Sequence, residues 1–343
     1  MFRRVSIPRR IIALFFLACL LLLPSVSPAL AAPGGKPQQF DNQNQNQDQN
    51  QNQNQDQNQN QPTILQLSQQ LPVIRYLALG DSLAYGFQPN DDHTHGYVDD
   101  LFTTLHSQGV TDHTNLGCPR ETTSTFIAGG KCSYPSQSQL ATALAYLQHQ
   151  PAGQATLVTL DIGANDVLDD MTINLQNKTC VVDVNKFKTD LQTLDKNLTK
   201  TILPQLHAAL IDQNGQITGI LALLNYYDPF QNVCPNTLPL IQTLNTHLAS
   251  DVKGLGILVD IFGAFGGTTT PNPNLCNYTW TCSAPPLGPD IHPTTTGYQV
   301  MAHAIEGSSQ ASQDQGSSQI SQDQGLLQTL KVLLDCKTGK KCK

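Results

Sequence analysis

The pattern of apolar positions predicts buried strands. Several runs are apolar throughout rather than at every second position, which is typical of strands covered on both faces of a parallel sheet. These runs lie at 73–80, 155–163, 217–229 and 254–265. A shorter strand is expected at 111–117.

Between these runs, apolar residues recur at helical spacing. Helices are predicted at 97–108, 138–150, 187–210, 238–252 and 294–307. Pro204 falls late in the 187–210 segment, where it predicts a kink or break. Strands that alternate with helices indicate an α/β fold with a parallel sheet. Ligands of such sheets bind at the carboxyl ends of strands, where Ser82 and Asn165 fall.

The first 31 residues have the pattern of a secretory signal peptide. Arginines precede an apolar run, and small residues follow up to Ala31. A membrane anchor is the alternative, but the run is shorter than the ~20 residues that a spanning helix needs. We therefore expect cleavage near Ala31, a secreted protein, and no transmembrane anchor after processing.

Polar segments of biased composition flank the expected domain. Residues 32–70 are rich in glutamine and asparagine and have few apolar side chains, which predicts a disordered spacer. Residues 308–343 contain the imperfect repeat SSQASQDQG–SSQISQDQG, typical of a linker, and a short tail with two cysteines. One folded domain is expected at 71–307. The tail leaves an association with the cell surface open.

The charge balance argues against nucleic acid as a partner. The chain has 19 basic and 26 acidic residues, and loss of four arginines with the signal leaves 15 basic residues and a net charge of −11. A phosphate backbone would be repelled by this charge.

The cysteines predict disulfides. Nine are present, and eight remain when Cys19 leaves with the signal, an even number that favours disulfides in an exported chain. Many pairings are possible. Nearest-neighbour order would join Cys118 with Cys132, Cys180 with Cys234, Cys276 with Cys282, and Cys336 with Cys342. A zinc site is the alternative, but the chain has no C-x-x-C or C-x-x-H pair.

A second possible metal site is the stretch DDHTH at 91–95, which offers Asp91, Asp92, His93 and His95. A solvated loop is the preferred interpretation of this stretch. No metal is therefore expected.

The candidate chemistry lies in blocks that follow one another along the chain. They are GDSL at 80–83, NLGCPRETT at 115–123, GAND at 163–166 and PDIHPTTTGY at 289–298. This ordered set resembles the GDSL or SGNH family of serine esterases and lipases, and the resemblance spans nearly the whole expected domain. It implies a flavodoxin-like three-layer α/β/α sandwich that hydrolyses carboxylic esters without a cofactor.

The resemblance also implies roles for single residues. Ser82 would be the nucleophile and His292 the general base that takes its proton. The oxyanion would be bound by the N–H of Ser82, by an N–H of the second block and by the side-chain amide of Asn165. Asp81 and Asp166 are expected to order their loops by accepting backbone N–H bonds.

Two blocks depart from the family pattern. The family's glycine in the second block falls on Arg120, while Gly117 lies three residues earlier, so both are candidates for the oxyanion N–H. The family's aspartate in the last block falls on Pro289, and the nearest acid is Asp290. One step along an extended segment turns a side chain to the other face. Asp290 is the preferred partner of His292, and a backbone carbonyl is the alternative.

Three hypotheses about the function remain open, and two of them differ in the substrate class. The cysteine-bearing loops and TWTCSAPPLGPDIHP resemble the secreted, disulfide-bonded bacterial lipases and esterases of the family, which implies acyl-lipid or short aliphatic esters. A carbohydrate O-acetylesterase would line its sugar site with aromatic side chains. The candidates are Tyr85, Phe87, Tyr97, Tyr226, Tyr227 and Trp280. The third reading, a non-catalytic surface-binding module, rests on the polar flanks.

Overall fold

A computed structural model describes residues 73–151, 154–174 and 177–308. The predicted signal peptide, the Gln/Asn-rich spacer, the tail beyond residue 308 and the Cys336–Cys342 pair lie outside these residues. The expected domain limits therefore stay predictions. Within the described ranges, no helix combines the length and apolar character needed to cross a membrane.

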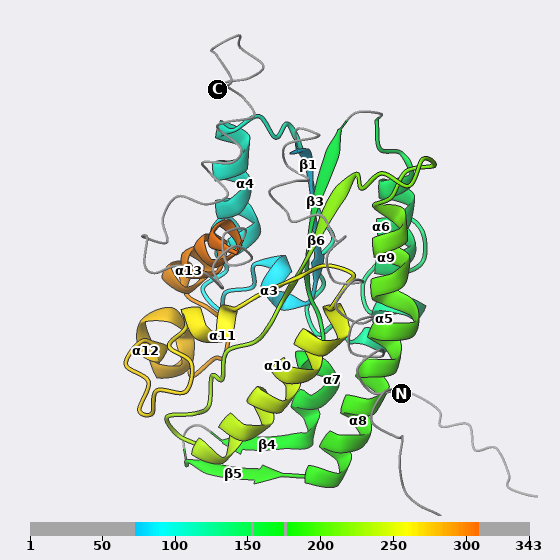
Figure 1. The fold of residues 1–343 in the computed structure, drawn as a ribbon. Coiled ribbons are helices and arrows are strands. Elements are labelled where there is room, and N and C mark those ends of the chain that lie inside the picture. Colours follow the sequence, from blue (N-terminus) through cyan, green and yellow to red (C-terminus); the bar gives the residue numbers. More distant parts are fainter. Residues whose placement is uncertain (1–72, 152–153, 175–176, 309–343) are drawn as a thin grey trace, which may run out of the picture. The chain divides into compact units, whose positions relative to one another are not determined.

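A five-stranded parallel sheet lies at the centre of the described chain (Figure 1). Its strands are β1 (Val73–Gly80), β2 (Asp112–Asn115), β3 (Ala155–Asp161), β6 (Gly219–Leu224) and β7 (Ile257–Val259). They are arranged in the order β2-β1-β3-β6-β7, and every neighbouring pair is parallel. This is the flavodoxin-like order. The predicted α/β class is confirmed.

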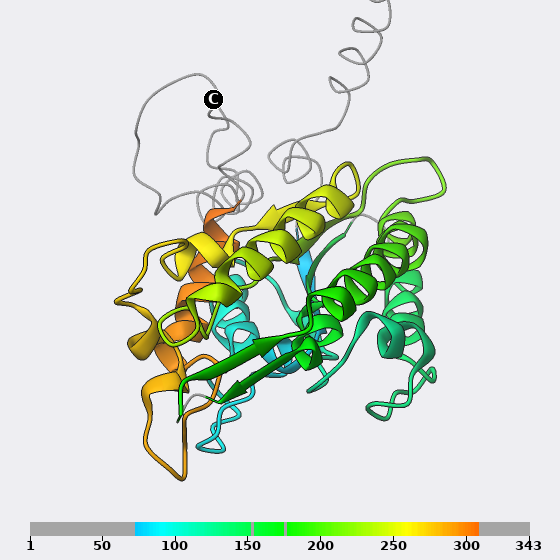
Figure 2. The same cartoon turned by 90° about the horizontal axis from the view of Figure 1, so that it is seen from below.

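Helices cover both faces of the sheet (Figures 1 and 2). One face carries α4 (Tyr97–Ser107) and α13 (Thr295–Gly307), which pack against each other. The other face carries α6 (Gln139–Gln148), α8 (Val184–Asn197), α9 (Leu203–Ala209) and α10 (Leu238–Val252). The central strands β3 and β6 are buried along their whole length, as their unbroken apolar runs predict.

Short helical elements lie mainly in the connections. They are α3 (Ser82–Tyr85), α5 (Thr123–Ala128), α7 (Ala164–Val167), α11 (Ile261–Ala264), α12 (Leu275–Tyr278), and the turns η1 (Leu168–Asp170), η3 (Pro235–Thr237) and η4 (Trp280–Cys282). Several of them begin or end at the carboxyl edge of the sheet.

The kink or break predicted near Pro204 takes the form of a change in helix type. A π-helical turn, η2 (Leu198–Ile202), separates α8 from α9, and Pro204 is the second residue of α9. A proline supplies no N–H to the preceding turn, and a π-turn is one way to accommodate that gap. Residues 184–209 are thus helical without a gap, and the π-turn interrupts only the α-helical hydrogen-bonding pattern.

Other segments also differ from the prediction. The strand expected at 217–229 ends at Leu224. The strand expected at 254–265 ends at Val259, because the carboxylate of Asp260 accepts the N–H of Gly263 (2.9 Å) and starts α11. The antiparallel hairpin of β4 (Met171–Asn174) and β5 (Thr179–Val182) was not predicted. Its strands are short, and in each of them exposed residues alternate with buried or half-buried ones.

The nearest-neighbour disulfides are confirmed for every cysteine in the described ranges: Cys118–Cys132, Cys180–Cys234 and Cys276–Cys282. The first closes the loop before α6, and the second joins β5 to the segment that follows β6. The third closes the segment that precedes His292. All of them fasten loops rather than the sheet.

Asp228, which follows β6, supplies a test of the fold's pH dependence. Its side chain is 1 % exposed and accepts the N–H of Phe230 (2.9 Å) and the hydroxyl of Thr237 (2.8 Å). Burial raises the pKa of Asp228 to about 6, although these hydrogen bonds oppose the shift.

Because the folded-state pKa is raised, the proton on Asp228 stabilises the native state fully below about pH 4. This stabilisation is lost as the pH rises through about 6. We expect the difference in unfolding free energy between wild type and Asp228→Asn to fall by on the order of 3 kcal/mol between these limits. Urea unfolding of both proteins across this range measures it. A difference that does not vary with pH would show that Asp228 ionises normally.

Candidate active site

Ser82 is placed by the end of β1. The strand ends at Gly80 with a φ of +139°, and a Cβ there would lie 2.3 Å from the carbonyl oxygen of Asp161 at the end of β3. Only glycine allows this approach of the two strand ends. Asp81 then caps α3 by accepting the N–H of Leu83 (2.9 Å). Ser82 thus begins a helix at the carboxyl edge, and its N–H is one of the donors without an intrahelical acceptor.

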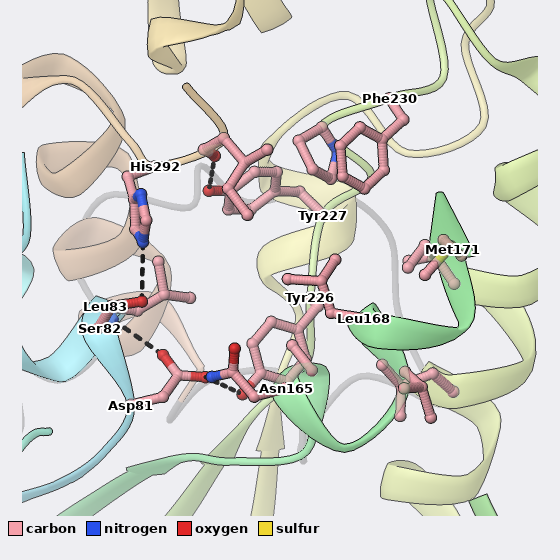
Figure 3. A pocket seen from close by; sticks show the side chains of 16 residues that line it. Asp81, Ser82, Leu83, Asn165, Leu168, Met171, Tyr226, Tyr227, Phe230 and His292 are labelled. Atoms are coloured by element: carbon pink, nitrogen blue, oxygen red, sulfur yellow. Dashed lines mark hydrogen bonds between the residues drawn. The ribbon is translucent and has the colours of Figure 1, made fainter. Parts of the chain in front are cut away.

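The structure brings His292 to Ser82. Its Nε2 lies 2.8 Å from the Ser82 Oγ, and its Nδ1 lies 2.7 Å from the Asp290 Oδ1 (Figure 3 shows the pocket beside this pair). With Nδ1 protonated and donating to Asp290, Nε2 is free to accept the serine proton. The ring of Phe87 packs against the imidazole, with centroids 4.5 Å apart.

Asp290 reaches His292 because the segment between them is not extended. The Asp290 Oδ1 also accepts the backbone N–H of His292 (2.9 Å), the pattern of an Asx turn. The change of face expected along an extended segment therefore does not occur. Burial alone would raise the pKa of Asp290, but the hydrogen bonds from His292 outweigh it and hold the pKa below its usual range. Of the two expected partners, the structure places the carboxylate on the ring.

Backbone hydrogen bonds hold the segment that carries His292. Trp280 donates its N–H to the His292 carbonyl (3.0 Å), and Asp290 donates its N–H to the Trp280 carbonyl (3.1 Å). The hydroxyl of Tyr227 donates to the carbonyl of Ile291 (2.7 Å). The imidazole is therefore positioned by its own loop as well as by Asp290.

Asn165 lies in α7, beside the same cavity as Ser82 and His292. Its Nδ2 donates to the Glu121 carbonyl (3.1 Å) and to the Asp81 Oδ2 (3.3 Å). Both amide hydrogens thus have acceptors in this structure.

The two candidates of the second block occupy different places. Arg120 lines the cavity beside Ser82 and has a φ of +66°, a conformation that glycine adopts more easily. Gly117 instead donates its N–H to the Asn115 Oδ1 (2.9 Å), and a Cβ there would lie 2.3 Å from the Tyr85 backbone nitrogen. The Gly117 N–H is thus bonded within its own loop, and Gly117 lines neither cavity at Ser82. Its role is the close approach of this loop to α3.

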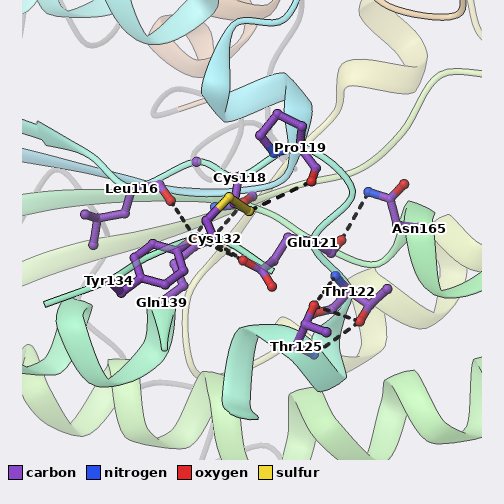
Figure 4. The surroundings of a disulfide bond; sticks show 12 residues. Leu116, Cys118, Pro119, Glu121, Thr122, Thr125, Cys132, Tyr134, Gln139 and Asn165 are labelled. Atoms are coloured by element: carbon purple, nitrogen blue, oxygen red, sulfur yellow. Dashed lines mark hydrogen bonds between the residues drawn. A yellow bond between two sulfur atoms is a disulfide. The ribbon is translucent and has the colours of Figure 1, made fainter. Parts of the chain in front are cut away.

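The disulfide Cys118–Cys132 fixes this loop (Figure 4). Tyr134 lies two residues after Cys132, and its hydroxyl donates to the Glu121 Oε2 (3.0 Å). Both contacts fix the Glu121 peptide, whose carbonyl accepts from Asn165. The second block thereby positions the side-chain amide of the third.

A buried carboxyl pair beneath Ser82 was missed by the sequence analysis. Asp161 and Asp81 are 0 % and 2 % exposed. Asp161 accepts the hydroxyl of Tyr97 (2.6 Å) and the N–H of Asp81 (3.1 Å), while the Asp81 Oδ2 accepts the hydroxyl of Tyr226 (3.1 Å). Burial raises the pKa of both carboxyls, and the charge of Asp81 raises the pKa of Asp161 further. The sequence feature that could have indicated this pair is Asp161, an acidic residue at the end of a mostly apolar strand.

The remaining loop acids behave as expected of solvated or structural groups. Asp166 accepts the backbone N–H of Thr123 (2.9 Å), as predicted. In the DDHTH stretch, Asp92 pairs with the Nδ1 of His95 (2.8 Å). Within the described ranges, no cluster of three or more His, Cys, Asp or Glu side chains is arranged to hold a metal ion.

Two cavities meet at Ser82, Asn165 and His292. One is enclosed by side chains from the segments after β3 and β6 and from α10, and is mostly apolar (Figure 3): Leu83, Val167, Leu168, Met171, Tyr226, Tyr227, Pro229, Phe230, Ile241, Leu244 and Ile291. The other carries polar and charged side chains at its rim, among them Arg120, Thr122, Lys131 and Asp169. The site can thus hold an apolar group on one side of Ser82 and a polar group on the other.

The contact between Asp290 and His292 predicts the effect of removing the acid. Asp290→Ala should lower kcat for ester hydrolysis by roughly 10²–10⁴-fold, because the imidazole loses its orienting acceptor and the stabilisation of its charged form. His292→Ala should abolish turnover. Steady-state kinetics of both variants measure this. Nearly full activity in Asp290→Ala would mean that a backbone carbonyl suffices.

The oxyanion donors can be separated by a second pair of variants. Asn165→Ala should lower kcat by about 10²–10³-fold, because it removes a side-chain donor. Arg120→Gly is the matched control: it keeps the backbone N–H and adopts the observed φ freely, so kcat should stay within about threefold of wild type. If Arg120→Gly lowered kcat as much as Asn165→Ala does, the arginine side chain itself would be needed for catalysis.

Known proteins share the sequence pattern and the architecture. The GDSL-like Lipase/Acylhydrolase family matches residues 78–300. Among solved structures, the chain is similar to Axe2, an acetylxylan esterase from Geobacillus stearothermophilus (14% identity, TM-score 0.49, 71% of this chain and 96% of that one). It is also similar to the lipase Lip_vut3 from a goat rumen metagenome (17%, 0.45, 68% and 96%).

At these identities and TM-scores the structural likenesses carry no further argument. A comparison with curated proteins finds no match. The family match covers well over half of the chain and includes every sequence block that meets at Ser82. The chain belongs to the GDSL-like lipase/acylhydrolase family, whose members are serine esterases.

Proposed function

We propose that the protein is a secreted serine esterase or lipase that hydrolyses carboxylic esters through an acyl-enzyme on Ser82. The observation that carries the proposal is the 2.8 Å contact between Ser82 Oγ and His292 Nε2, with Asp290 on the other ring nitrogen. A hydroxyl becomes a useful nucleophile when a positioned base takes its proton. Family membership supplies the general reaction, hydrolysis of an ester.

The reaction follows from the positions of these groups. Ser82 Oγ attacks the ester carbonyl carbon while its proton passes to His292 Nε2, and Asp290 stabilises the imidazolium. The oxyanion is bound by the N–H groups of Ser82 and Arg120 and by the amide of Asn165. The C–O bond to the alcohol then breaks, and His292 returns the proton to the departing oxygen. Water repeats the sequence on the acyl-enzyme, which releases the acid and restores Ser82.

The two cavities differ in their lining, and this difference supports a proposal for where the two halves of the ester bind. The enclosed apolar cavity suits the acyl chain, since hydroxyls in its wall are already bonded: Tyr226 to Asp81 and Tyr227 to the Ile291 carbonyl. The polar cavity, with Arg120 and Lys131 at its rim, suits the alcohol. This division favours acyl-lipid or aliphatic esters as substrates.

Export is supported by two independent features of the chain. The first 31 residues have the pattern of a signal peptide. The disulfides that fasten the loops are rare in reducing compartments. The predicted tail beyond the domain would allow association with a cell surface.

A carbohydrate O-acetylesterase is the second candidate, and one observation favours it. Phe87 lines the polar cavity, and Tyr85, two residues earlier, is 44 % exposed, so aromatic surface is available near the alcohol side. Against it, Tyr97 is fully buried, and Tyr226 and Tyr227 line the apolar cavity rather than the polar one.

A panel of p-nitrophenyl esters of graded chain length tests the proposal. The mature protein should hydrolyse esters beyond acetate, while Ser82→Ala should lose at least about 10³-fold in kcat because the nucleophile is gone. A fluorophosphonate probe should label the wild type only. A sharp fall in rate beyond acetate would favour the O-acetylesterase. Failure of the folded protein both to hydrolyse any ester and to react with the probe would leave a binding module.

A further inference from the structure

Met171 and Phe230, with Leu168 and Ile291, lie between the enclosed cavity and a second, open groove, because all of them line both. The side chains of Met171 and Phe230 line the enclosed cavity on the side away from Ser82 and His292 (Figure 3). Both also line the groove, together with Leu168, Ile173, Pro289 and Ile291. The groove itself does not include Ser82. A chain that extends from Ser82 through the apolar cavity, away from His292, meets Met171 and Phe230 before it reaches the groove.

The partition is fixed on both sides. Met171 is 8 % exposed and begins the hairpin, whose base is closed by the Asp183 N–H on the Asp170 carbonyl (2.9 Å) and by the ion pair of Lys186 with Asp170. Phe230 is 5 % exposed, and its N–H donates to Asp228 (2.9 Å).

A covalent link joins the two sides of the partition. The disulfide Cys180–Cys234 connects the second strand of the hairpin to the segment that carries Phe230. The N–H of Cys234 donates to the Phe230 carbonyl (2.7 Å). The hairpin and Phe230 are therefore held at a fixed separation, and a chain end cannot pass by displacing the backbone.

The space before the partition is small. The cavity is about 60 Å³ in volume. Since the share of one water molecule in the liquid is about 30 Å³, this space holds roughly two groups of that size. A short acyl chain fills it.

We propose that Met171, facing Phe230, sets the acyl-chain length that the enzyme accepts. Short chains end against the two side chains, and longer chains are excluded because the groove beyond is closed to them. This inference rests on the proposed esterase function and deepens it. Methionine is unbranched and flexible, so Met171 rather than the ring of Phe230 is the side chain whose size governs passage.

The test compares substitutions at Met171 in opposite directions. Met171→Ala should open the enclosed cavity to the groove and raise the ratio of kcat/KM for p-nitrophenyl octanoate over butyrate by about tenfold or more. Met171→Trp should lower that ratio by a similar factor while acetate hydrolysis persists. Ile173→Ala is the matched control: it enlarges the groove but not the enclosed cavity, so the ratio should stay within about twofold of wild type.

Melting temperatures identify the variants that remain folded, and either Met171 variant alone decides the question. An unchanged ratio in a folded Met171 variant would overturn the inference, as would an equal shift in Ile173→Ala. Absence of ester hydrolysis by the folded wild type would instead contradict the proposed function. The ratio for the wild type also bears on the inference, since a preference for octanoate over butyrate would show that the partition does not limit chain length.

Discussion

The hydrogen bond between Ser82 and His292 is the constraint on which the site depends. It joins residues 210 positions apart, so the fold must bring the end of the first strand to the segment before the last helix. The sheet order achieves half of this, because the carboxyl ends of β1 and β3 are neighbours and together support Ser82 and Asn165. The other half comes from the loop of His292, which is fixed by backbone bonds to Trp280 and by Tyr227.

Polar groups beneath the site serve this geometry at an energetic cost. Asp81 and Asp161 are buried together, and ionising both carboxyls would cost free energy because like charges repel in a buried environment. Their hydrogen bonds to Tyr97, Tyr226 and the backbone around Ser82 offset part of that cost. The result is a rigid support for the nucleophile, while the disulfides fasten the loops that complete the cavities.

Much of the fold and of the central site could be predicted, for physical reasons. Unbroken apolar runs revealed the buried strands, and family blocks placed Ser82, Asn165 and His292 at one edge. The apolar pattern did not predict local capping: Asp260 starts a helix inside an apolar run, and Asp290 reaches His292 through a turn. It did not predict long-range contacts either. Nothing in the short strands of the hairpin indicated that Met171 would line the cavity.

The most direct test of the central claim is peptide mass mapping of enzyme quenched during turnover of a p-nitrophenyl ester. The account predicts one added acyl group on the peptide that contains Ser82, and no such adduct in His292→Ala during the same interval. Turnover with the acyl group on another residue, or acylation of Ser82 at an undiminished rate without His292, would contradict it.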